Sequence, residues 1–157
     1  MFNIYIYNLG TYNTVYSSVS NSDELSDEIF KATNHGMNDY DIGILDHPYN
    51  FKVNDLQMLF RIAKDFNTRI EDVGALLQCF TANEVIEILE LGKFYTLINS
   101  DSQINAFEEY TKEYDVIEIP SHLENYIDYE SMMIDWQHSG LAIEHIGNGE
   151  YLIADTL

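Results

Sequence analysis

The segment Phe2–Leu9 alternates between two sets of side chains. Ile4 and Ile6 fall on one side of an extended backbone and Tyr5 and Tyr7 on the other, which is the period of a β-strand. Apolar spacing and turn residues predict three further elements, a strand over 14–19, a helix beginning at 21–24 and a strand over 40–45. The first third of the chain is therefore expected to form a small α+β unit.

Apolar residues between positions 54 and 92 recur every three or four positions instead, which predicts three short helices. Thr68 with Glu71, and Thr81 with Glu84, have the spacing of a capping box at a helix N-terminus. Gly92 adopts positive φ easily and suits the end of the last helix. The middle of the chain is therefore expected to be helical.

Strands and helices alternate again in the last part of the chain. The pattern predicts a strand over 94–98, a helix from Asp101, a strand over 116–119 and a hairpin made of 141–146 and 151–154. The sequence Gly147-Asn148-Gly149 lies between the two hairpin strands, and tight hairpin turns need residues that tolerate positive φ. A second α+β part is therefore expected here.

These elements together predict an α+β fold with three small subdomains. The expected boundaries are 1–53 for the N-terminal sheet plus helix, 54–92 for the helical middle, and 93–157 for the C-terminal part with its hairpin.

The segment from Pro120 to Gly140 carries the densest set of large apolar and aromatic side chains. Pro120 ends the preceding element, and Ser121 with Glu124 has capping-box spacing, so one helical segment is predicted up to Gly140. Large side chains recur in it at helical intervals, and they suit either the core or a subunit interface, where Tyr, Trp and Met are enriched. The expected core or dimer-interface residues are Tyr126, Tyr129, Met133 and Trp136.

The charge of the chain is unusual, with 27 acidic and 7 basic residues and a net charge of −20. So few Lys and Arg residues cannot neutralise many phosphates, so we expect no binding to nucleic acid or to an anionic membrane. A basic partner protein, divalent cations and a high-salt habitat are all compatible with this charge. From Phe94 to the end, 13 acidic residues stand against one basic residue, Lys112.

Carboxylates at this density can imitate the phosphates of DNA. Acidic side chains three or four residues apart on a helix lie about 5–6 Å from each other, and a DNA duplex carries one charge per about 1.7 Å of its axis. An acidic face can therefore occupy a DNA-binding groove, although a solvated surface is the ordinary alternative. The acids expected on a DNA-mimic surface are Asp23, Glu24, Asp27, Glu28, Glu108, Glu109, Glu113, Asp115, Glu118 and Glu124.

Catalytic chemistry is not expected. Asp39 and Asp41 are neighbouring carboxylates, but nothing in the sequence places a substrate between them. The histidines lack the spacing of a metal motif, and the chain has no phosphate-binding or dinucleotide fingerprint. We therefore expect no catalytic residue, no metal and no cofactor. The alternative that stays open is a metal-dependent enzyme using Asp135, His138 and His145.

Cys79 is the single cysteine, so no disulfide can form within the chain. Its apolar neighbours predict a buried and unreactive thiol. The first residues lack the basic region of a signal peptide, and no apolar run approaches the ~20 residues that span a bilayer. We therefore expect a cytoplasmic protein.

Two motifs resemble the ArdA family of antirestriction proteins. The first is a strand followed by a turn of the form N-L-G-x-Y-N, matched by residues 8–13. The second has the form L-x-x-Y-I-D-Y-x-x-x-x-x-D-x-x-x-S-G and is matched by residues 123–140. The chain departs from the family at 14–20, where a Gly-rich strand with Trp is usual, and at Ile134, where Arg is frequent.

This resemblance implies an elongated, three-part protein that dimerises through its C-terminal part and imitates bent DNA. Members of the family occupy the DNA-binding groove of type I restriction-modification enzymes, are carried on mobile genetic elements and catalyse no reaction. The partners that the resemblance implies are such an enzyme in a bacterial host and a second copy of the chain. The alternative is a related mimic directed at another DNA-binding machine, such as a CRISPR effector.

Overall fold

Three antiparallel strands open the fold: β1 (Phe2–Asn8), β2 (Thr14–Val19) and β3 (Tyr40–Ile44), in the order β2-β1-β3. The computed structural model describes residues 1–45 and 53–155, and the side chains of all of these except 53–55. Ile4 and Ile6 are buried on one face of β1, and Tyr5 and Tyr7 lie half-buried on the other. The alternation in the sequence therefore predicted both this strand and its two faces correctly.

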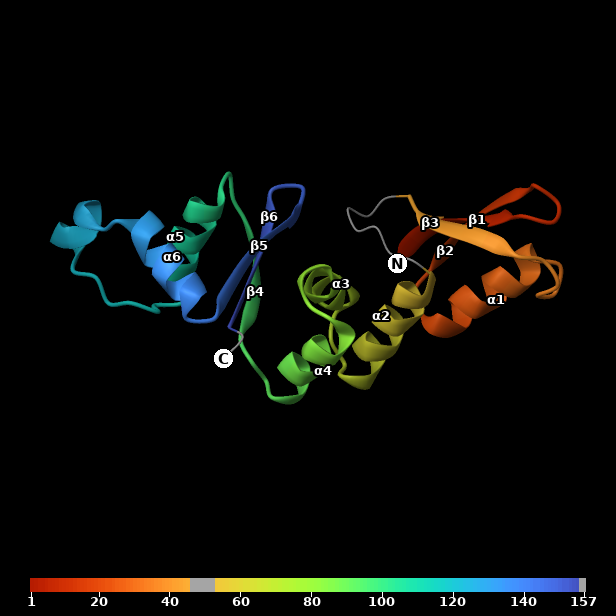
Figure 1. Cartoon of the computed structure of the whole chain (residues 1–157), viewed down its shortest axis with the longest axis horizontal. Helices are drawn as coiled ribbons and strands as arrows, with labels where there is room; N and C mark the ends of the chain where they lie inside the picture. Colours follow the sequence, from red (N-terminus) through yellow and green to blue (C-terminus); the bar gives the residue numbers. More distant parts are fainter. Residues whose placement is uncertain (46–52, 156–157) are drawn as a thin grey trace. The chain divides into compact units, whose positions relative to one another are not determined.

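Helix α1 (Ser22–Ala32) packs on the face of this sheet that carries the isoleucines (Figure 1). Its buried residue Leu25 faces the strands. The side-chain oxygen of Asn21 caps the helix by accepting a hydrogen bond from the N–H of Glu24 at 2.9 Å. The helix begins where the sequence predicted it.

Asn8 holds the turn between β1 and β2 from inside the fold. Its side-chain oxygen accepts hydrogen bonds from the N–H groups of Gly10 and Thr11, at 2.8 and 3.0 Å. Its Nδ2 donates to the carbonyl oxygen of Ala32, at 2.9 Å. Asn8 is only 3% exposed, so this one buried side chain links the turn to the end of α1 through three hydrogen bonds.

The middle of the chain is helical, as predicted, with α2 (Val53–Asp65), α3 (Ile70–Cys79) and α4 (Ala82–Glu90). The capping box predicted for α4 is present. The N–H of Thr81 donates to a Glu84 oxygen at 2.8 Å, and the N–H of Glu84 donates to Thr81 Oγ1 at 3.4 Å.

The capping box predicted at Thr68 and Glu71 is wrong. Helix α3 begins at Ile70, so its N-cap is Arg69, whose carbonyl oxygen accepts a hydrogen bond from the N–H of Val73 at 3.2 Å. Thr68 lies one residue before the cap, where its hydroxyl cannot take part in a capping box.

The chain divides into two compact units, Met1–Gln78 and Cys79–Leu157, which we call the N-terminal and C-terminal units. The first contains α2 and nearly all of α3, and the second begins just before α4. The expected α+β class is correct, with a helical middle between two three-stranded sheets. The subdomain boundaries at 53 and 92 stay predictions.

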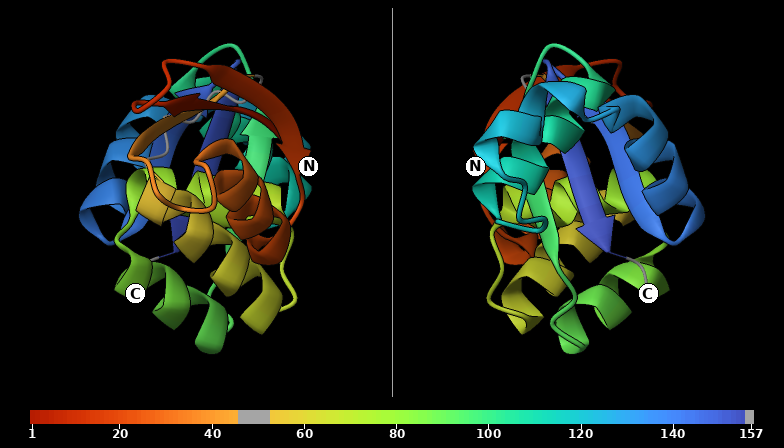
Figure 2. Two further views of the ribbon diagram at one scale, coloured as in Figure 1. Left: turned by 90° about the vertical axis from the view of Figure 1, so that its right-hand side faces the viewer. Right: turned by 90° about the vertical axis from the view of Figure 1, so that its left-hand side faces the viewer.

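The C-terminal unit contains the second antiparallel sheet, with β4 (Tyr95–Asn99), β5 (Leu141–Gly147) and β6 (Glu150–Asp155) in the order β4-β6-β5. Helices α5 (Gln103–Glu113) and α6 (Tyr129–His138) pack on it, as Figure 2 shows. The predicted hairpin joins β5 to β6 through Asn148 and Gly149, whose φ angles are 52° and 70°. Two successive positive φ angles are typical of the tight turn expected there.

The segment 120–140 is two helical pieces rather than one. Pro120 precedes a 3-10 helix, η1 (Ser121–Tyr126), in which Ser121 makes no capping bond. Ile127 is extended, and Asp128 then caps α6 by accepting a hydrogen bond from the N–H of Ser131 at 3.0 Å. The single helix and its cap at Ser121 were therefore wrongly predicted, because the chain turns at 127–128 before its apolar residues reach the core.

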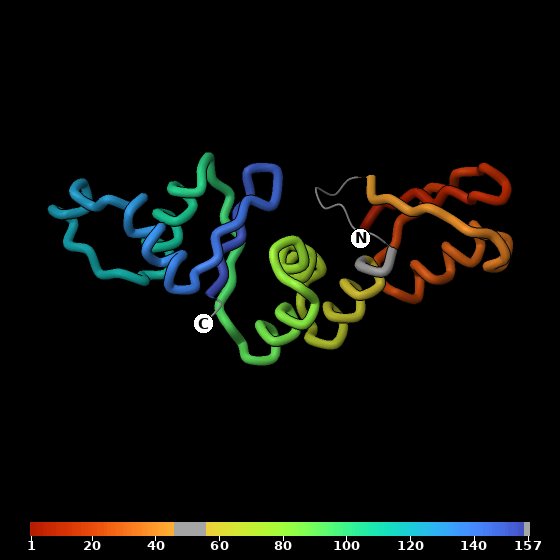
Figure 3. Tube along the Cα trace, in the orientation of Figure 1, coloured from red at the N-terminus to blue at the C-terminus, as the bar shows by residue number. Residues whose placement is uncertain are grey.

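The strand predicted over 116–119 is also wrong. Among the described residues this segment pairs with no strand and leads from α5 to η1, a path that Figure 3 traces. Pro120 directly after it lacks a backbone donor, which is unfavourable for continued strand pairing.

Candidate acidic surface

Six of the ten acids expected on a DNA-mimic surface lie between α5 and the end of η1, in the C-terminal unit. Three are on α5, two are in the segment that follows, and one is on η1. Only the first is half-buried, and the other five are exposed. We call this set the α5–η1 acidic surface, made of Glu108, Glu109, Glu113, Asp115, Glu118 and Glu124.

Lys112 brings two of these carboxylates together. Its Nζ lies 2.6 Å from Glu108 Oε1 and 3.5 Å from Glu124 Oε1, although the two acids come from different helices. The hydrogen bond to Glu108 is the main cause that raises the pKa of Lys112 above its ordinary value. A single exposed ammonium group neutralises two carboxylates only in part.

The negative charge is divided unevenly between the two units. The C-terminal unit contains 16 acidic and 2 basic residues, a net charge of −14, whereas the N-terminal unit contains 11 acidic and 5 basic residues, a net charge of −6. Like charges at this density repel each other and lower the stability of the fold.

The acids of α1 have more local partners. A side-chain oxygen of Glu24 accepts a hydrogen bond from the N–H of Ser20 at 2.7 Å, so this residue helps to hold the helix start. Glu28 pairs with Lys31 at 3.0 Å, and this hydrogen bond is the main cause that lowers the pKa of the Glu28 carboxyl. The other two acids, Asp23 and Asp27, are exposed.

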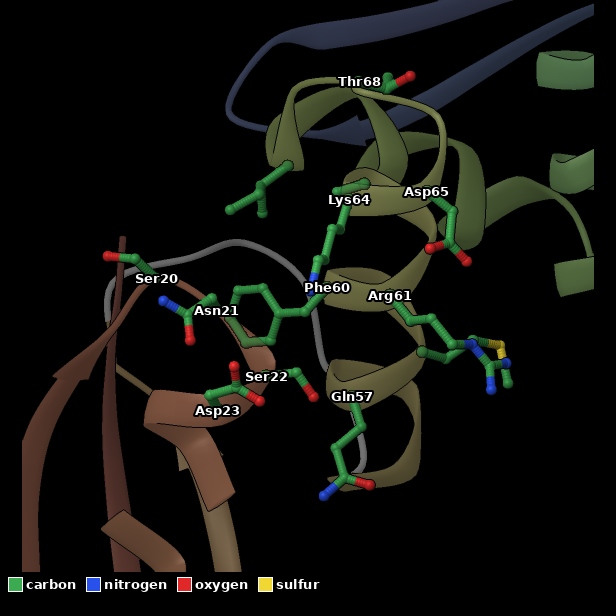
Figure 4. A pocket seen from close by; sticks show the side chains of 13 residues that line it. Ser20, Asn21, Ser22, Asp23, Gln57, Phe60, Arg61, Lys64, Asp65 and Thr68 are labelled. Atoms are coloured by element: carbon green, nitrogen blue, oxygen red, sulfur yellow. The ribbon is translucent and has the colours of Figure 1, made fainter. Parts of the chain in front are cut away.

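Asp23 also lines a hollow of about 700 Å³ between the start of α1 and helix α2. Arg61 and Lys64 of α2 contribute to the same lining. In Figure 4 the ring of Phe60 points towards the start of α1, whereas Arg61 points to the opposite side of α2. Asp23 therefore shares the lining of this hollow with Lys64, whereas the α5–η1 acidic surface has Lys112 alone among the basic residues after Phe94.

The structure separates the four residues expected in the core or at a dimer interface. Tyr129 and Met133 are buried in the C-terminal core, at 9% and 5% exposure. Trp136 packs against the same core, with its ring centre 5.4 Å from that of Phe107 in an edge-on contact. Tyr126 is 83% exposed on η1, so it is no core residue of the described chain, and only the interface role stays open for it.

The three residues of the metal-site alternative do not form a metal site. Among the residues that the structure describes, no three His, Cys, Asp or Glu side chains lie close enough together to hold a metal ion. Asp135, His138 and His145 therefore do not converge. Cys79 is half-buried, and burial, with a smaller contribution from Glu144, raises the pKa of its thiol to about 11.

Two residues with clear roles were missed by sequence reasoning. Lys112 lies four positions after Glu108, a spacing that predicts a helical ion pair, but its contact with Glu124 depends on the tertiary structure. Asp128 falls inside the single helical segment that the sequence predicts up to Gly140. The residues after Asp128 form no capping motif clearer than the one that begins at Ser121, so the sequence did not identify Asp128 as the cap of α6.

No model of a known protein family matches the chain, and neither does any curated protein. In the described part of the chain, no helix combines the length and apolar character needed to cross a bilayer.

Proposed function

We propose that this protein is a DNA mimic that inhibits a type I restriction-modification enzyme by occupying its DNA-binding groove. The observation that carries the proposal is the α5–η1 acidic surface, where six acidic residues and a single lysine, Lys112, occur in a unit with a net charge of −14. The resemblance of residues 8–13 and 123–140 to ArdA proteins supports the same function.

The physical basis of this inhibition is electrostatic. A groove that binds DNA is lined with Lys and Arg residues, and neutralising them releases bound counterions, which makes binding depend steeply on salt. Carboxylates on a folded surface offer the same groove negative charges that are already held in place, so little conformational entropy is lost on binding. The inhibitor acts by competition and needs no catalytic residue and no cofactor.

A second copy of the chain is part of the proposal. Tyr126 exposes a large aromatic ring next to the exposed Leu123 on η1, and aromatic residues are enriched at subunit interfaces. Sedimentation of Tyr126→Ala beside the parent protein tests this assignment. A dimer that persists unchanged in the variant excludes Tyr126 from the interface.

The proposed function is tested by competition between the protein and DNA for a purified type I restriction-modification enzyme. We expect that excess protein stops DNA cleavage and that added salt weakens the inhibition. A triple variant, Glu113→Gln, Asp115→Asn and Glu118→Gln, should inhibit about tenfold less well, because each exposed ion pair contributes roughly 0.5 kcal/mol. Cleavage that continues unchanged with the parent protein in excess refutes the proposal.

The matched control removes the same number of charges elsewhere. The variant Asp65→Asn, Glu71→Gln and Glu90→Gln changes three exposed acids outside the proposed surface. Both triple variants carry a net charge of −17 in place of −20. Equal loss of inhibition in both would show that total charge, and no particular surface, is responsible. A parallel assay with a purified CRISPR effector distinguishes the alternative target.

A further inference from the structure

The sheet of the N-terminal unit has one face that α1 does not cover. Directly opposed residues of antiparallel strands point to the same side, so the pairing of strands identifies what this face carries. Tyr5 of β1 lies between Tyr16 of β2 and Gly43 of β3, and Tyr7 lies between Thr14 and Asp41. We call this the open face, made of Tyr5, Tyr7, Thr14, Tyr16, Asp41 and Gly43.

The three tyrosine rings lie on the surface of this sheet. Tyr16 is 70% exposed, and Tyr5 and Tyr7 are half-buried. A side chain at Gly43 would begin 2.6 Å from Tyr5 Oη, so the Tyr5 ring lies across the neighbouring strand in the space that glycine leaves. Tyr5 and Tyr16 are cross-strand neighbours on the open face, and Tyr7 lies two residues along β1 on the same face.

The charge of the open face has one sign. Asp41 is exposed beside Tyr7, and Asp39 precedes β3 at the same edge, where its carbonyl oxygen accepts a hydrogen bond from the N–H of Leu9 at 2.9 Å. No Lys or Arg occurs in the three strands, and the first basic residue of the chain is Lys31, on α1. A ligand of this face therefore meets aromatic rings and carboxylates, but no cation of the strands.

These groups suit one kind of side chain best. The face of an aromatic ring attracts cations, and the planar guanidinium of arginine stacks on rings and also pairs with carboxylates. Bases of single-stranded nucleic acid also stack on aromatic platforms, but such sites need cations along the phosphate backbone. The strands of the open face offer none, and the net charge of −20 repels a nucleic acid.

We infer that the open face is a second binding surface, which holds arginine side chains of a basic protein segment between tyrosine rings and the carboxylates of Asp39 and Asp41. This inference does not depend on the proposed DNA mimicry. It rests on aromatic rings of the N-terminal unit, which stack on a guanidinium group, whereas DNA mimicry rests on carboxylates that imitate phosphates. It holds whether or not the α5–η1 acidic surface binds a restriction enzyme.

The test titrates the full chain with two synthetic probes, a hexa-arginine and a hexa-lysine peptide. Binding is measured from the NMR chemical shifts of the protein at 0.3 M salt. Salt at this concentration screens exposed charges, while stacking persists. We expect the arginine peptide to bind more tightly than the lysine peptide and to shift amide signals of β1, β2 and β3. Tyr16→Leu should weaken binding of the arginine peptide about two- to fivefold, the range of one exposed cation–π contact.

Two further variants keep the test decisive. Phe30→Leu removes an exposed aromatic ring of α1, outside the open face, and should leave arginine-peptide binding unchanged. Asp41→Asn should weaken binding of both peptides at low salt. Equal affinity for the two peptides, shifts confined to α5 and η1, or unchanged binding by Tyr16→Leu would overturn the inference. So would binding of an oligodeoxythymidylate to this face, or shifts of its signals with protein concentration alone.

Discussion

Replacing Asn8 by alanine should loosen the N-terminal unit far more than the loss of one small side chain suggests. The side chain accepts hydrogen bonds from the N–H groups of Gly10 and Thr11 and donates one to Ala32 O. In Asn8→Ala all three groups lose their hydrogen bond to this side chain. The Asn8 residue is only 3% exposed in the parent protein.

The size of the effect follows from these three contacts. A hydrogen bond within a protein contributes about 1 kcal/mol net, and a buried group left without a partner costs about 1–3 kcal/mol. The two turn N–H groups are near the surface and regain part of their hydrogen bonding from water. We therefore expect a loss of about 3 kcal/mol in the local stability of β1, β2 and α1, which corresponds to roughly a hundredfold increase in local opening.

Amide hydrogen exchange, read peptide by peptide, measures this effect where it occurs. Peptides from β1, β2 and α1 should exchange roughly a hundredfold faster in Asn8→Ala than in the parent. Peptides from β4, α5 and β6 belong to the other unit and serve as an internal reference. Asn13→Ala is the matched control, because it removes an exposed asparagine of the same turn.

If Asn8→Ala and Asn13→Ala change exchange equally, or if neither changes it by more than about threefold, then the three side-chain hydrogen bonds contribute little. A comparable increase in exchange at β4–β6 would instead mean that the variant affects the whole chain.

Four further outcomes are expected. Phe107→Ala should cost about 3–5 kcal/mol in chemical denaturation of the C-terminal unit, because the ring is fully buried and contacts Trp136. Tyr129→Phe should be neutral or stabilise by up to about 1 kcal/mol in the same assay, since Tyr129 Oη is buried without a hydrogen-bond partner among the described atoms; clear destabilisation would contradict this. The thiol of Cys79, with its pKa raised from 9.0 to about 11, should react with iodoacetamide at pH 8 about a hundredfold more slowly than the thiol of the unfolded chain, since the thiolate is the nucleophile. The backbone N–H of Ser131 lowers the pKa of Asp128 below 3.8, so NMR signals at the start of α6 should be constant above about pH 4 and change as the pH falls through that lowered pKa, when protonation removes the cap.

Local patterns were sufficient for much of the fold. The alternation in Phe2–Leu9 predicted a strand with two distinct faces, and Asn148-Gly149 predicted a tight hairpin turn, because both depend on backbone preferences of neighbouring residues. The charge of −20 follows from composition alone. It argues against partners that need many cations on this chain, whatever the fold.

The same short pattern, Ser or Thr followed three residues later by Glu, occurs at Thr68, Thr81 and Ser121, yet it forms a capping box only at Thr81. A capping box depends on where the helix begins. That point is decided by which apolar residues reach the core, a property of the tertiary structure that no four-residue window contains.

Local spacing and composition were enough to predict the α+β class, most helices and strands, and the excess of acids in the last part of the chain. By contrast, the burial of Tyr129, the exposure of Tyr126 and the contacts of Lys112 with both Glu108 and Glu124 could be read only from the folded chain. These outcomes depend on how η1 and α6 fold back beside α5. Contacts between residues distant in the sequence follow from packing, which periodicity does not specify.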